Sequence, residues 1–471
     1  MASTRTPRRT TYSSKGLVIT KNLTVGPPVR IIVAFTLPLL VGNLFQQLYA
    51  VTDAMVVGRL LGVDALAAVG ASGSLQFLLL GFSFGASAGV TIPVARAFGA
   101  GDLPAMRRAV SAGALISAAI VVAITLIGTL GSRTLLTWMG TPPELMDNAA
   151  TFLAVIFGGS AATVAFNFLS SVIRAVGDSR TPLIFLIIAC VLNAGLVVLF
   201  IGVFGMGVGG AAGATIVAQV ISVILCLALV ARRMPDLVLH REDLRITRSD
   251  LGDSSRLGLT MGFQMSVIAV GAAILQYGVN TLGTDAVAAF TTAVRVEQVA
   301  VAPMISLGIA MSTYVAQNLG AGQSYRIRLG VFRVTGLALA MSVVLTAVII
   351  VFGSDLVRLF VGSGADQVVA MAHRYLVINA SMYSVLALLF VIRNSLQGLG
   401  NAAVPTVAGF MELIARAVVG LFFVERIGYL GVCLAAPLAW VAALTPMAIA
   451  WAVQHRRLAS ADVEAPVLQT A

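Results

Sequence analysis

Charged side chains are scarce in this sequence. Of its 471 residues only 10% are charged, whereas 59% are hydrophobic. A soluble domain does not need so much apolar surface, so the composition indicates a polytopic membrane protein. The formal net charge of +11 does not indicate a nucleic-acid partner, because the basic residues lie between apolar segments and do not cluster on one soluble face.

Cysteine, histidine and nucleotide-binding motifs are also rare or absent. The three cysteines, Cys190, Cys226 and Cys433, lie in apolar runs, which argues against disulfides. The three histidines are widely spaced and form no metal-ligand pattern. The sequence contains no GxxxxGK[ST] or HExxH motif. We therefore expect no enzyme, no ATP motor within this chain, no cofactor and no metal beyond a coupling ion.

Long hydrophobic runs, in contrast, are abundant. A membrane-spanning helix needs about 20 apolar residues, and the runs between turn signals that reach this length predict an all-α polytopic membrane protein with 12 transmembrane helices. The runs cover roughly residues 30–58, 64–98, 105–130, 145–175, 181–203, 208–231, 255–282, 286–319, 327–352, 368–397, 403–425 and 429–454.

Basic residues in the connections predict the orientation. Most of the 30 lysine and arginine residues fall on the side of the N-terminal tail, and this set includes Arg174 and Arg393, whereas Arg295 and Arg416 fall inside apolar runs. Because basic connections favour the cytoplasmic side, we expect a cell (inner) membrane protein with both termini in the cytoplasm. The expected domains are a disordered cytoplasmic tail (1–28), a six-helix lobe (29–231), a cytoplasmic linker (232–254), a second six-helix lobe (255–455) and a C-terminal cytoplasmic tail (456–471).

The two expected lobes are related by an internal repeat. Residues 61–68 (LGVDALAA) match residues 282–289 (LGTDAVAA), and residues 98–101 (FGAG) match residues 319–322 (LGAG) at the same offset. Six helices return the chain to the side where it began, so the two lobes must share one topology. The repeat therefore predicts a pseudo-two-fold axis along the membrane normal.

One apolar run carries a carboxylate, Asp53. A charge near the bilayer centre costs roughly 2.5–3.5 kcal/mol on insertion scales, so such a residue usually faces a protein interior or a wet cavity. Gln46 and Tyr49 fall near the same helical face as Asp53. The alternative is a carboxylate that reaches water at the helix end without function, because Arg59 follows about a turn and a half later.

The stretch from Pro38 to Gly70 resembles the MATE (multidrug and toxin extrusion) family, and the prokaryotic branches most closely. Residues 316–322 (AQNLGAG) and 394–400 (NSLQGLG) carry the same likeness, which extends from about residue 28 to 455. The resemblance implies two six-helix lobes around a central cavity that work by alternating access. It also implies H⁺- or Na⁺-driven export of amphiphilic, often cationic, compounds.

The resemblance also implies an ion-coupling site. Family members carry a coupling carboxylate at the position of Asp53, and their polar partners correspond to Asn193 and Thr215. A carboxylate in apolar surroundings gains proton affinity and a nearby cation has the opposite effect, so one acid can exchange an ion for a substrate. The sequence departs from some members at Val197, where they have an additional acid, and it has no acid in the run 255–282, where others use one.

Two further acids lie within apolar runs of the second lobe. Glu412 precedes Arg416 by four residues and can pair with it on one helix face, whereas Glu297 lies two residues from Arg295. Two interpretations stay open: internal ion pairs that fix helix packing, and a second-lobe polar site formed by Glu297, Glu412 and Arg416 that binds ions or substrate.

Polar and aromatic side chains on several runs are candidates for lining a substrate cavity. The expected partners are an amphiphilic small molecule, H⁺ or Na⁺, and the lipid bilayer, with the protein acting as a monomer. A lipid-linked precursor flippase is the alternative function, but it favours a strongly cationic cavity, and the basic residues inside the runs are few and near acids. The candidate lining residues are Gln46, Tyr49, Asn167, Gln264, Gln276, Tyr277 and Asn379.

Overall fold

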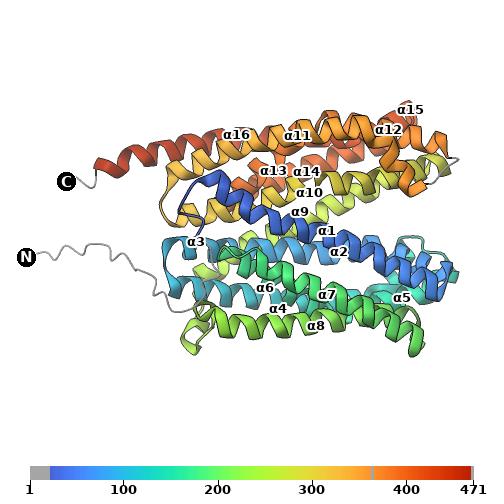
Figure 1. The fold of residues 1–471 in the computed structure, drawn as a ribbon, viewed down its shortest axis with the longest axis horizontal. Coiled ribbons are helices and arrows are strands. Elements are labelled where there is room, and N and C mark those ends of the chain that lie inside the picture. The colour runs from blue at the N-terminus through green and yellow to red at the C-terminus, as the bar shows by residue number, and fades with distance from the viewer. Residues whose placement is uncertain (1–21, 362–364, 468–471) are drawn as a thin grey trace, which may run out of the picture.

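The computed structural model describes residues 22–361 and 365–467. Within these ranges the chain forms helices and no strand. Most of the expected N-terminal tail, residues 1–21, and residues 468–471 of the expected C-terminal tail lie outside the described residues. The helices run side by side along the length of the molecule (Figure 1), as expected for a membrane-spanning bundle.

The first half of the chain begins with one long helix and ends before a polar connection that holds two short 3₁₀ turns, Pro235–Leu237 and Arg241–Leu244. A π-helical turn, Leu199–Val203, follows α7 directly. The helices are α1 (Pro28–Leu61), α2 (Val63–Val90), α3 (Ile92–Ala100), α4 (Leu103–Trp138), α5 (Pro143–Gly158), α6 (Ser160–Ala175), α7 (Arg180–Val198) and α8 (Gly207–Arg233).

The second half repeats this order. A π-helical turn, Val419–Phe423, follows α14, as the other π turn follows α7. The first helix of this half begins at Arg248, inside the segment expected to be a linker. The helices are α9 (Arg248–Asn280), α10 (Thr284–Gly320), α11 (Ser324–Val361), α12 (Asp366–Ser381), α13 (Tyr383–Gly398), α14 (Ala403–Val418), α15 (Val424–Ile427) and α16 (Tyr429–Val467).

The span count agrees with the sequence prediction. The described residues contain 10 helices that are long and apolar enough to cross a membrane, or up to 12 if two bent pairs each count as one span. The pairs α5–α6 and α12–α13 bend by 49° and 54° at corresponding places in the two halves. The sequence analysis treated each pair as one straight run and missed both bends. The first bend has a local cause, because Gly158 and Gly159 stand at the break.

Helix α1 crosses from one half of the molecule to the other (Figure 1). Near its start, Ile32 and Phe35 are packed into the hydrophobic core of the second half. Near its end, Val57 belongs to the core of the first half. Pro38 lies between these two attachment points and removes one helical hydrogen bond there. A movement of one half relative to the other must therefore act on α1.

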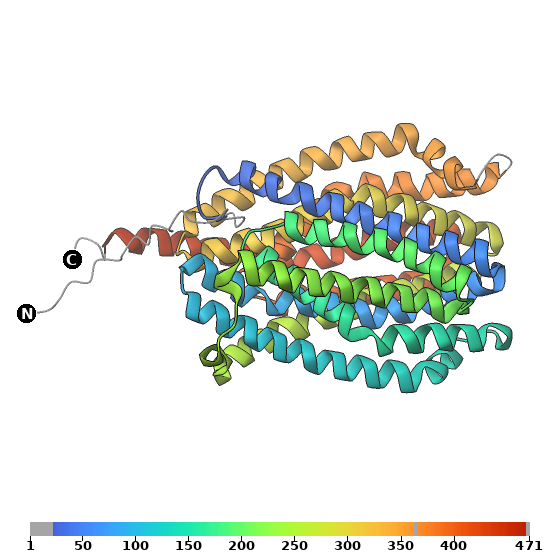
Figure 2. The same ribbon diagram turned by 60° about the horizontal axis from the view of Figure 1, so that its bottom comes forward.

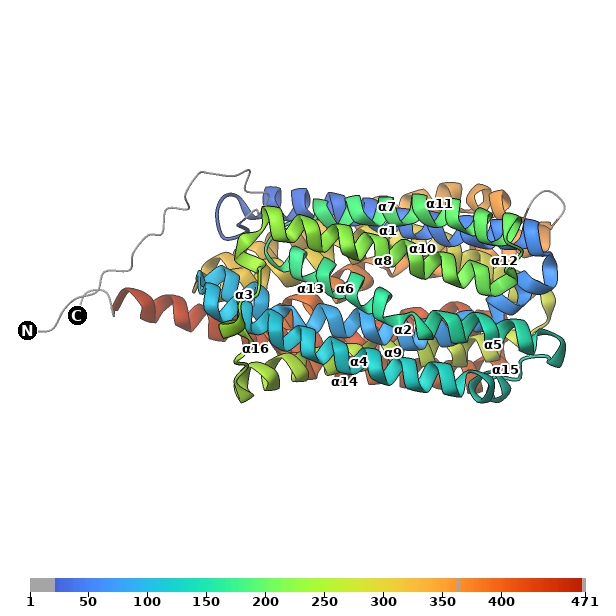
Figure 3. The same ribbon diagram turned by 90° about the horizontal axis from the view of Figure 1, so that it is seen from below.

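Both the start of α1 and the end of α16 lie at the same end of the bundle (Figures 2 and 3). We call this the termini end. At the termini end, Gln317 of α10 accepts a hydrogen bond from Leu23 N at 3.0 Å and donates one to Ala175 O of α6 at 2.8 Å. Arg96 of α3 donates to Leu399 O in the other half at 3.4 Å. Residues 96 and 317 occupy corresponding positions of the repeat, so the two contacts are reciprocal.

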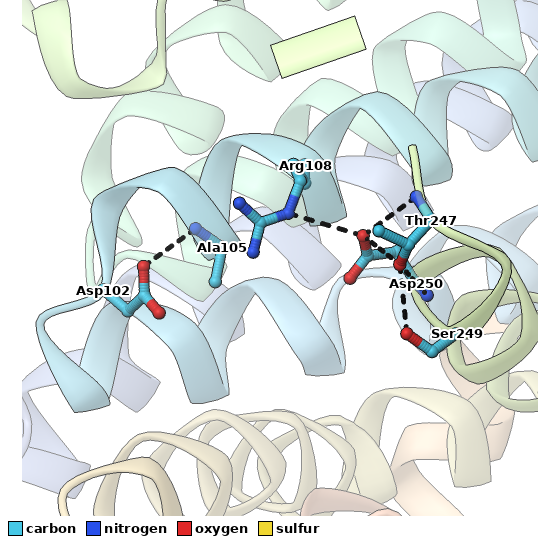
Figure 4. Close-up of polar contacts among 6 residues, drawn as sticks. All are labelled: Asp102, Ala105, Arg108, Thr247, Ser249 and Asp250. Atoms are coloured by element: carbon cyan, nitrogen blue, oxygen red, sulfur yellow. Dashed lines mark hydrogen bonds and ion pairs between the residues drawn. The ribbon is translucent and has the colours of Figure 1, made fainter. Parts of the chain in front are cut away.

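A charged contact also joins the halves at the termini end (Figure 4). Arg108 of α4 forms an ion pair with Asp250 of α9, with 3.4 Å between Nε and Oδ2. Asp250 and Thr247 cap α9 reciprocally, each accepting a hydrogen bond from the other's backbone N–H at 3.2 Å. Asp102 caps α4 by accepting from Ala105 N at 2.9 Å. These caps fix the first turns of two helices from different halves beside each other.

Two glycines allow the backbones of the halves to touch. A Cβ atom on Gly99 of α3 would overlap the carbonyl oxygen of Gln317, and one on Gly320 of α10 would overlap that of Arg96. Hydrogen bonds and an ion pair between described residues join the halves at the termini end and midway along the helices, as at Asn43 Nδ2 to Ser306 Oγ, 2.8 Å. The molecule is thus closed at the termini end.

Candidate functional site

Asp53 lies in a cavity of about 200 Å³ between α1 and α7. Its Oδ1 atom is buried and has no hydrogen-bond partner among the described residues. Asp53 is also the only acidic residue among the described residues that line this cavity, and Val197 lies in the same wall. The lining residues are Phe45, Leu48, Tyr49, Thr52, Asp53, Val56, Cys190, Val191, Asn193, Ala194 and Val197.

A hydrogen-bonded cluster adjoins Asp53 and joins three helices. The Tyr49 hydroxyl of α1 donates to Thr215 Oγ1 of α8 at 3.0 Å, and Asn193 Nδ2 of α7 donates to the same atom at 2.9 Å. Thr215 in turn donates to Ala211 O at 3.3 Å. The structure therefore brings together the expected Asn193 and Thr215, and adds Tyr49, which the sequence analysis assigned to cavity lining. The Thr215 hydroxyl has its donor and both acceptor positions in use.

A buried charge cluster lies inside the second half. Arg416 Nη2 donates to Glu412 Oε1 at 2.9 Å, which confirms the pairing predicted from their spacing. Arg393 Nη2 of α13 donates to Glu412 Oε2 at 3.0 Å. Arg393 lies near the end of the expected run 368–397 and is buried here: its residue is 7% exposed and its partner Glu412 is 4% exposed. Spacing along one helix predicts the first pair, but the second joins two helices and has no local signal.

Glu297 of α10 lies apart from Arg295, which is exposed. The hydroxyl of Tyr375 in α12 donates to Glu297 Oε2 at 3.2 Å, and Glu297 Oε1 is buried with no hydrogen-bond partner among the described residues. Arg416 is close enough to Glu297 for their charges to interact. The second half thus holds two carboxylates and two guanidinium groups near one another.

A further cavity, of about 120 Å³, lies between the two halves. We call it the interface cavity. It is lined by α2, α3, α6, α9, α10 and α13, and the expected residue Gln264 lies in its wall, bonded to Gln397 at 2.8 Å. An adjoining hollow of about 50 Å³ contains the expected residues Gln46 and Asn167. Arg174 lines both spaces, and Arg393 lines the larger one.

The remaining expected lining residues lie elsewhere. Gln276 Nε2 donates to Asn280 Oδ1 at 2.8 Å near the end of α9, and Tyr277 is 67% exposed. Asn379 is fully buried within the second half and donates to Tyr375 O and Cys433 O at 2.9 and 3.3 Å. None of these three residues lines the Asp53 cavity, the interface cavity or its adjoining hollow.

The described residues thus form two related helical halves of a multi-pass membrane protein, with cavities within and between them. The family model MatE matches twice, at residues 38–199 and 261–422, once in each half. The chain belongs to the MATE family of transporters.

Curated relatives and solved structures agree with this assignment. The Bacillus subtilis protein named "Probable multidrug resistance protein YpnP" is 30% identical over 80% of this chain and 84% of its own length. A Thermotoga maritima relative, "Probable multidrug resistance protein NorM", is 25% identical over 85% of this chain and 87% of its own length. The fold matches the solved outward-facing structure of a multidrug resistance MATE family transporter with a TM-score of 0.86 and 21% identity, covering 95% of this chain and 99% of that one.

Proposed function

We propose that this chain is a secondary active antiporter of the cell (inner) membrane, acting as a monomer with both termini in the cytoplasm. It exports amphiphilic small molecules in exchange for H⁺ or Na⁺ by alternating access. The observation that carries the proposal is Asp53, a carboxylate with one buried, unpartnered oxygen in a cavity inside an otherwise apolar span. The names of the relatives, which describe multidrug resistance, support the substrate class.

In the proposed mechanism Asp53 binds and releases the coupling ion. A proton would neutralise the carboxylate directly. Na⁺ would need further oxygen ligands, as hard cations do, and Asn193, in the same cavity, has a side-chain oxygen not used by its bond to Thr215. Thr215 has a structural role in this conformation, because its hydroxyl group already makes three hydrogen bonds, with Tyr49, Asn193 and Ala211.

Helix α1 connects ion binding with the movement of the halves. It carries Asp53 in the first half, while Ile32 and Phe35 anchor its start in the second half. A change in charge at Asp53 alters how the end of α1 packs against α7, and Pro38 is the place where the helix can bend. With cytoplasmic termini, closure at the termini end makes this conformation outward-facing.

Gradient-driven efflux tests the proposal. Purified protein in proteoliposomes loaded with a fluorescent amphiphile is given a pH gradient alone or a Na⁺ gradient alone. We expect one gradient to accelerate efflux, and Asp53→Asn to reduce that acceleration at least tenfold, because the amide cannot exchange a charge. The matched control is Asp64→Asn, an exposed acid in the first turn of α2, which should behave as wild type.

Gradient-driven efflux that survives Asp53→Asn would exclude Asp53 as the coupling residue and direct attention to Glu297 and Glu412. Efflux that ignores both gradients would contradict ion coupling altogether. The flippase then becomes the second candidate function, favoured by Arg174 and Arg393 in the walls of the interface cavity. Both arginines lie near the ends of expected runs, 145–175 and 368–397, and no pattern along the sequence indicates that they line a cavity.

A further inference from the structure

The charged residues that line the interface cavity are all basic. Its described lining contains Arg174 of α6 and Arg393 of α13, and neither Asp nor Glu. The adjoining hollow adds polar groups such as Asn43, Gln46 and Asn167 but again no acid among its described lining residues. The two arginines come from opposite halves, and each lies on the second helix of a bent pair. The cavity therefore presents positive charge from both of its sides.

Arg174 has no acidic partner among the described residues. Its Nη2 donates to Ser171 Oγ at 2.8 Å, and no carboxylate of the described residues lies within 4.0 Å of its guanidinium group. The acid that follows along the chain, Asp178, is buried, but its Oδ1 accepts from the backbone N–H groups of Arg180 and Thr181 at 2.9 and 3.1 Å. A guanidinium charge in an apolar wall is costly without a counter-charge, so a ligand anion would supply what the protein lacks.

Arg393 is only partly neutralised. It shares Glu412 with Arg416, so one carboxylate contacts two guanidinium groups, at 3.0 and 2.9 Å. Glu297 interacts with Arg416 from the far side of this cluster but does not line the cavity. The Arg393 side chain is 8% exposed, and its Nε atom is buried without a hydrogen-bond partner among the described residues. The ion pair with Glu412 thus fixes the position of Arg393, which also borders the cavity.

The remaining walls of the interface cavity are mostly apolar. They include Met261 and Met265, whose flexible side chains adapt to different shapes, together with Phe84 and Phe390. A volume of about 120 Å³ accommodates an anionic head group with the first atoms of its carrier. Such walls fit the apolar part of an amphiphile beside its charged group.

We propose that the interface cavity binds the anionic group of an amphiphilic substrate, a carboxylate, sulfonate or phosphate, with Arg174 and Arg393 as its counter-charges. The resemblance to the family implies amphiphilic, often cationic, substrates, and this inference differs from that expectation in the sign of the charge. The transport of such an anion rests on the proposed antiporter function, whereas its binding does not. Guanidinium groups bind these anions through paired N–H donors, which gives both charge and orientation.

Two dyes with the same xanthene skeleton and opposite charge test the proposal. Binding of carboxyfluorescein and of rhodamine 123 to the purified full chain in lipid nanodiscs is followed by fluorescence anisotropy. We expect wild type to bind the anionic dye at least tenfold more tightly than the cationic one. Arg174→Gln should weaken carboxyfluorescein about tenfold and leave rhodamine 123 unchanged or tighter. Tighter binding of rhodamine 123 by wild type would overturn the proposal without use of any variant.

The choice of glutamine and two control variants separate charge from folding. Gln is the residue at the corresponding position 397 of the other half, so the bundle accepts it at such a place. Arg174→Lys keeps the charge and should retain most of the affinity. Arg133→Gln removes an exposed arginine that pairs with Asp147 on the surface, and should bind as wild type. Equal affinity for carboxyfluorescein in wild type and Arg174→Gln would contradict the assignment of Arg174.

Two further experiments identify the source of the anion and distinguish binding from transport. Displacement of carboxyfluorescein by phosphatidylglycerol, but not by phosphatidylcholine, would assign the site to a lipid head group; displacement by neither would assign it to a free organic anion. If rhodamine 123 efflux is lost in Asp53→Asn but wild type binds no anion, the antiporter proposal stands and the anion site is rejected. If anion binding is lost in Arg174→Gln but wild type shows no gradient-driven efflux, the anion site stands and the antiporter proposal is rejected.

Discussion

At the scale of the residue, Thr215 shows how one side chain orders the surroundings of Asp53. Its hydroxyl accepts from Tyr49 and Asn193 and thereby ties α8 to α1 and α7. The three side chains come from three helices, so their meeting point depends on the packing of the whole first half.

Thr215→Val should therefore destabilise the first half more than Tyr49→Phe does. Valine keeps the shape but leaves two buried donors unpaired, at about 1–3 kcal/mol for each unsatisfied group. Thermal unfolding in detergent measures the effect. In the double variant Thr215→Val with Tyr49→Phe, the loss should be smaller than the sum of the single losses, because one unpaired donor has been removed. Strict additivity would show that the two hydroxyl groups do not interact.

Glu412 should be a sensitive position in the second half. Glu412→Gln leaves Arg393 and Arg416 buried side by side without their shared carboxylate, and breaking such a cluster typically costs about 3–5 kcal/mol. Thermal unfolding of the variant should show a clear fall in Tm. Glu144→Gln, in the exposed first turn of α5, is the control and should change Tm little. A Glu412→Gln variant as stable as this control would mean that the cluster is neutral for stability.

Sequence reasoning at the residue scale succeeds where partners share a helix. The spacing of Glu412 and Arg416 predicts their pair, and the spacing of Tyr49 and Asp53 places both on one face of α1. Contacts between helices carry no such signal, so spacing does not predict the second partner of Glu412, Arg393. Asn193 and Thr215 entered only through the resemblance to the family, since nothing in their own surroundings along the chain points to Asp53.

At the scale of the element, the close approach of α3 and α10 depends on glycine. Gly99 faces the Gln317 carbonyl and Gly320 faces the Arg96 carbonyl, and the repeat relates the two contacts. The backbones meet without room for a side chain. This pair of helices is therefore the place where a single methyl group has the greatest effect on closure of the termini end.

Gly320→Ala should shift the protein away from the closed termini end. Its methyl group meets backbone, which cannot rotate aside, so the halves must separate or the helices must shift. Spin labels at the exposed positions Ala100 of α3 and Tyr325 of α11 report the separation of the two halves by double electron–electron resonance. We expect a longer or broader distance distribution than in wild type. Gly336→Ala on α11, where a methyl group meets no atom within 4 Å, is the control; equal distributions in all three proteins would contradict the steric role of Gly320.

Apolar runs predict the membrane spans, because the hydropathy of a segment depends only on which residues it contains and not on its contacts with other helices. Turn residues and changes in polarity also placed most helix ends within a few residues. The bends within α5–α6 and α12–α13 were missed, and only the first is marked by glycines, at Gly158 and Gly159. The second bend, at Met382, has no glycine or proline, so its origin lies in packing between helices and not in the local sequence.

At the scale of the whole molecule, the internal repeat predicted two halves of equal topology, and both matches to the MatE model agree with it. The repeat could not predict which end of the bundle is closed, because in the proposed alternating access the same sequence supports closure at either end in turn. Nor could it predict the sign of the charge in the interface cavity. That sign depends on which side chains of α6 and α13 point between the halves.

The central claim is that substrate and coupling ion move in opposite directions through one molecule, with Asp53 as the link. Coupling run in reverse tests it most directly. In proteoliposomes with no ion gradient, an imposed gradient of a transported dye should drive H⁺ or Na⁺ against the direction of the dye, measured with an internal ion indicator. We expect this ion movement in wild type and its loss in Asp53→Asn. Dye movement in wild type without any opposing ion movement would contradict the account.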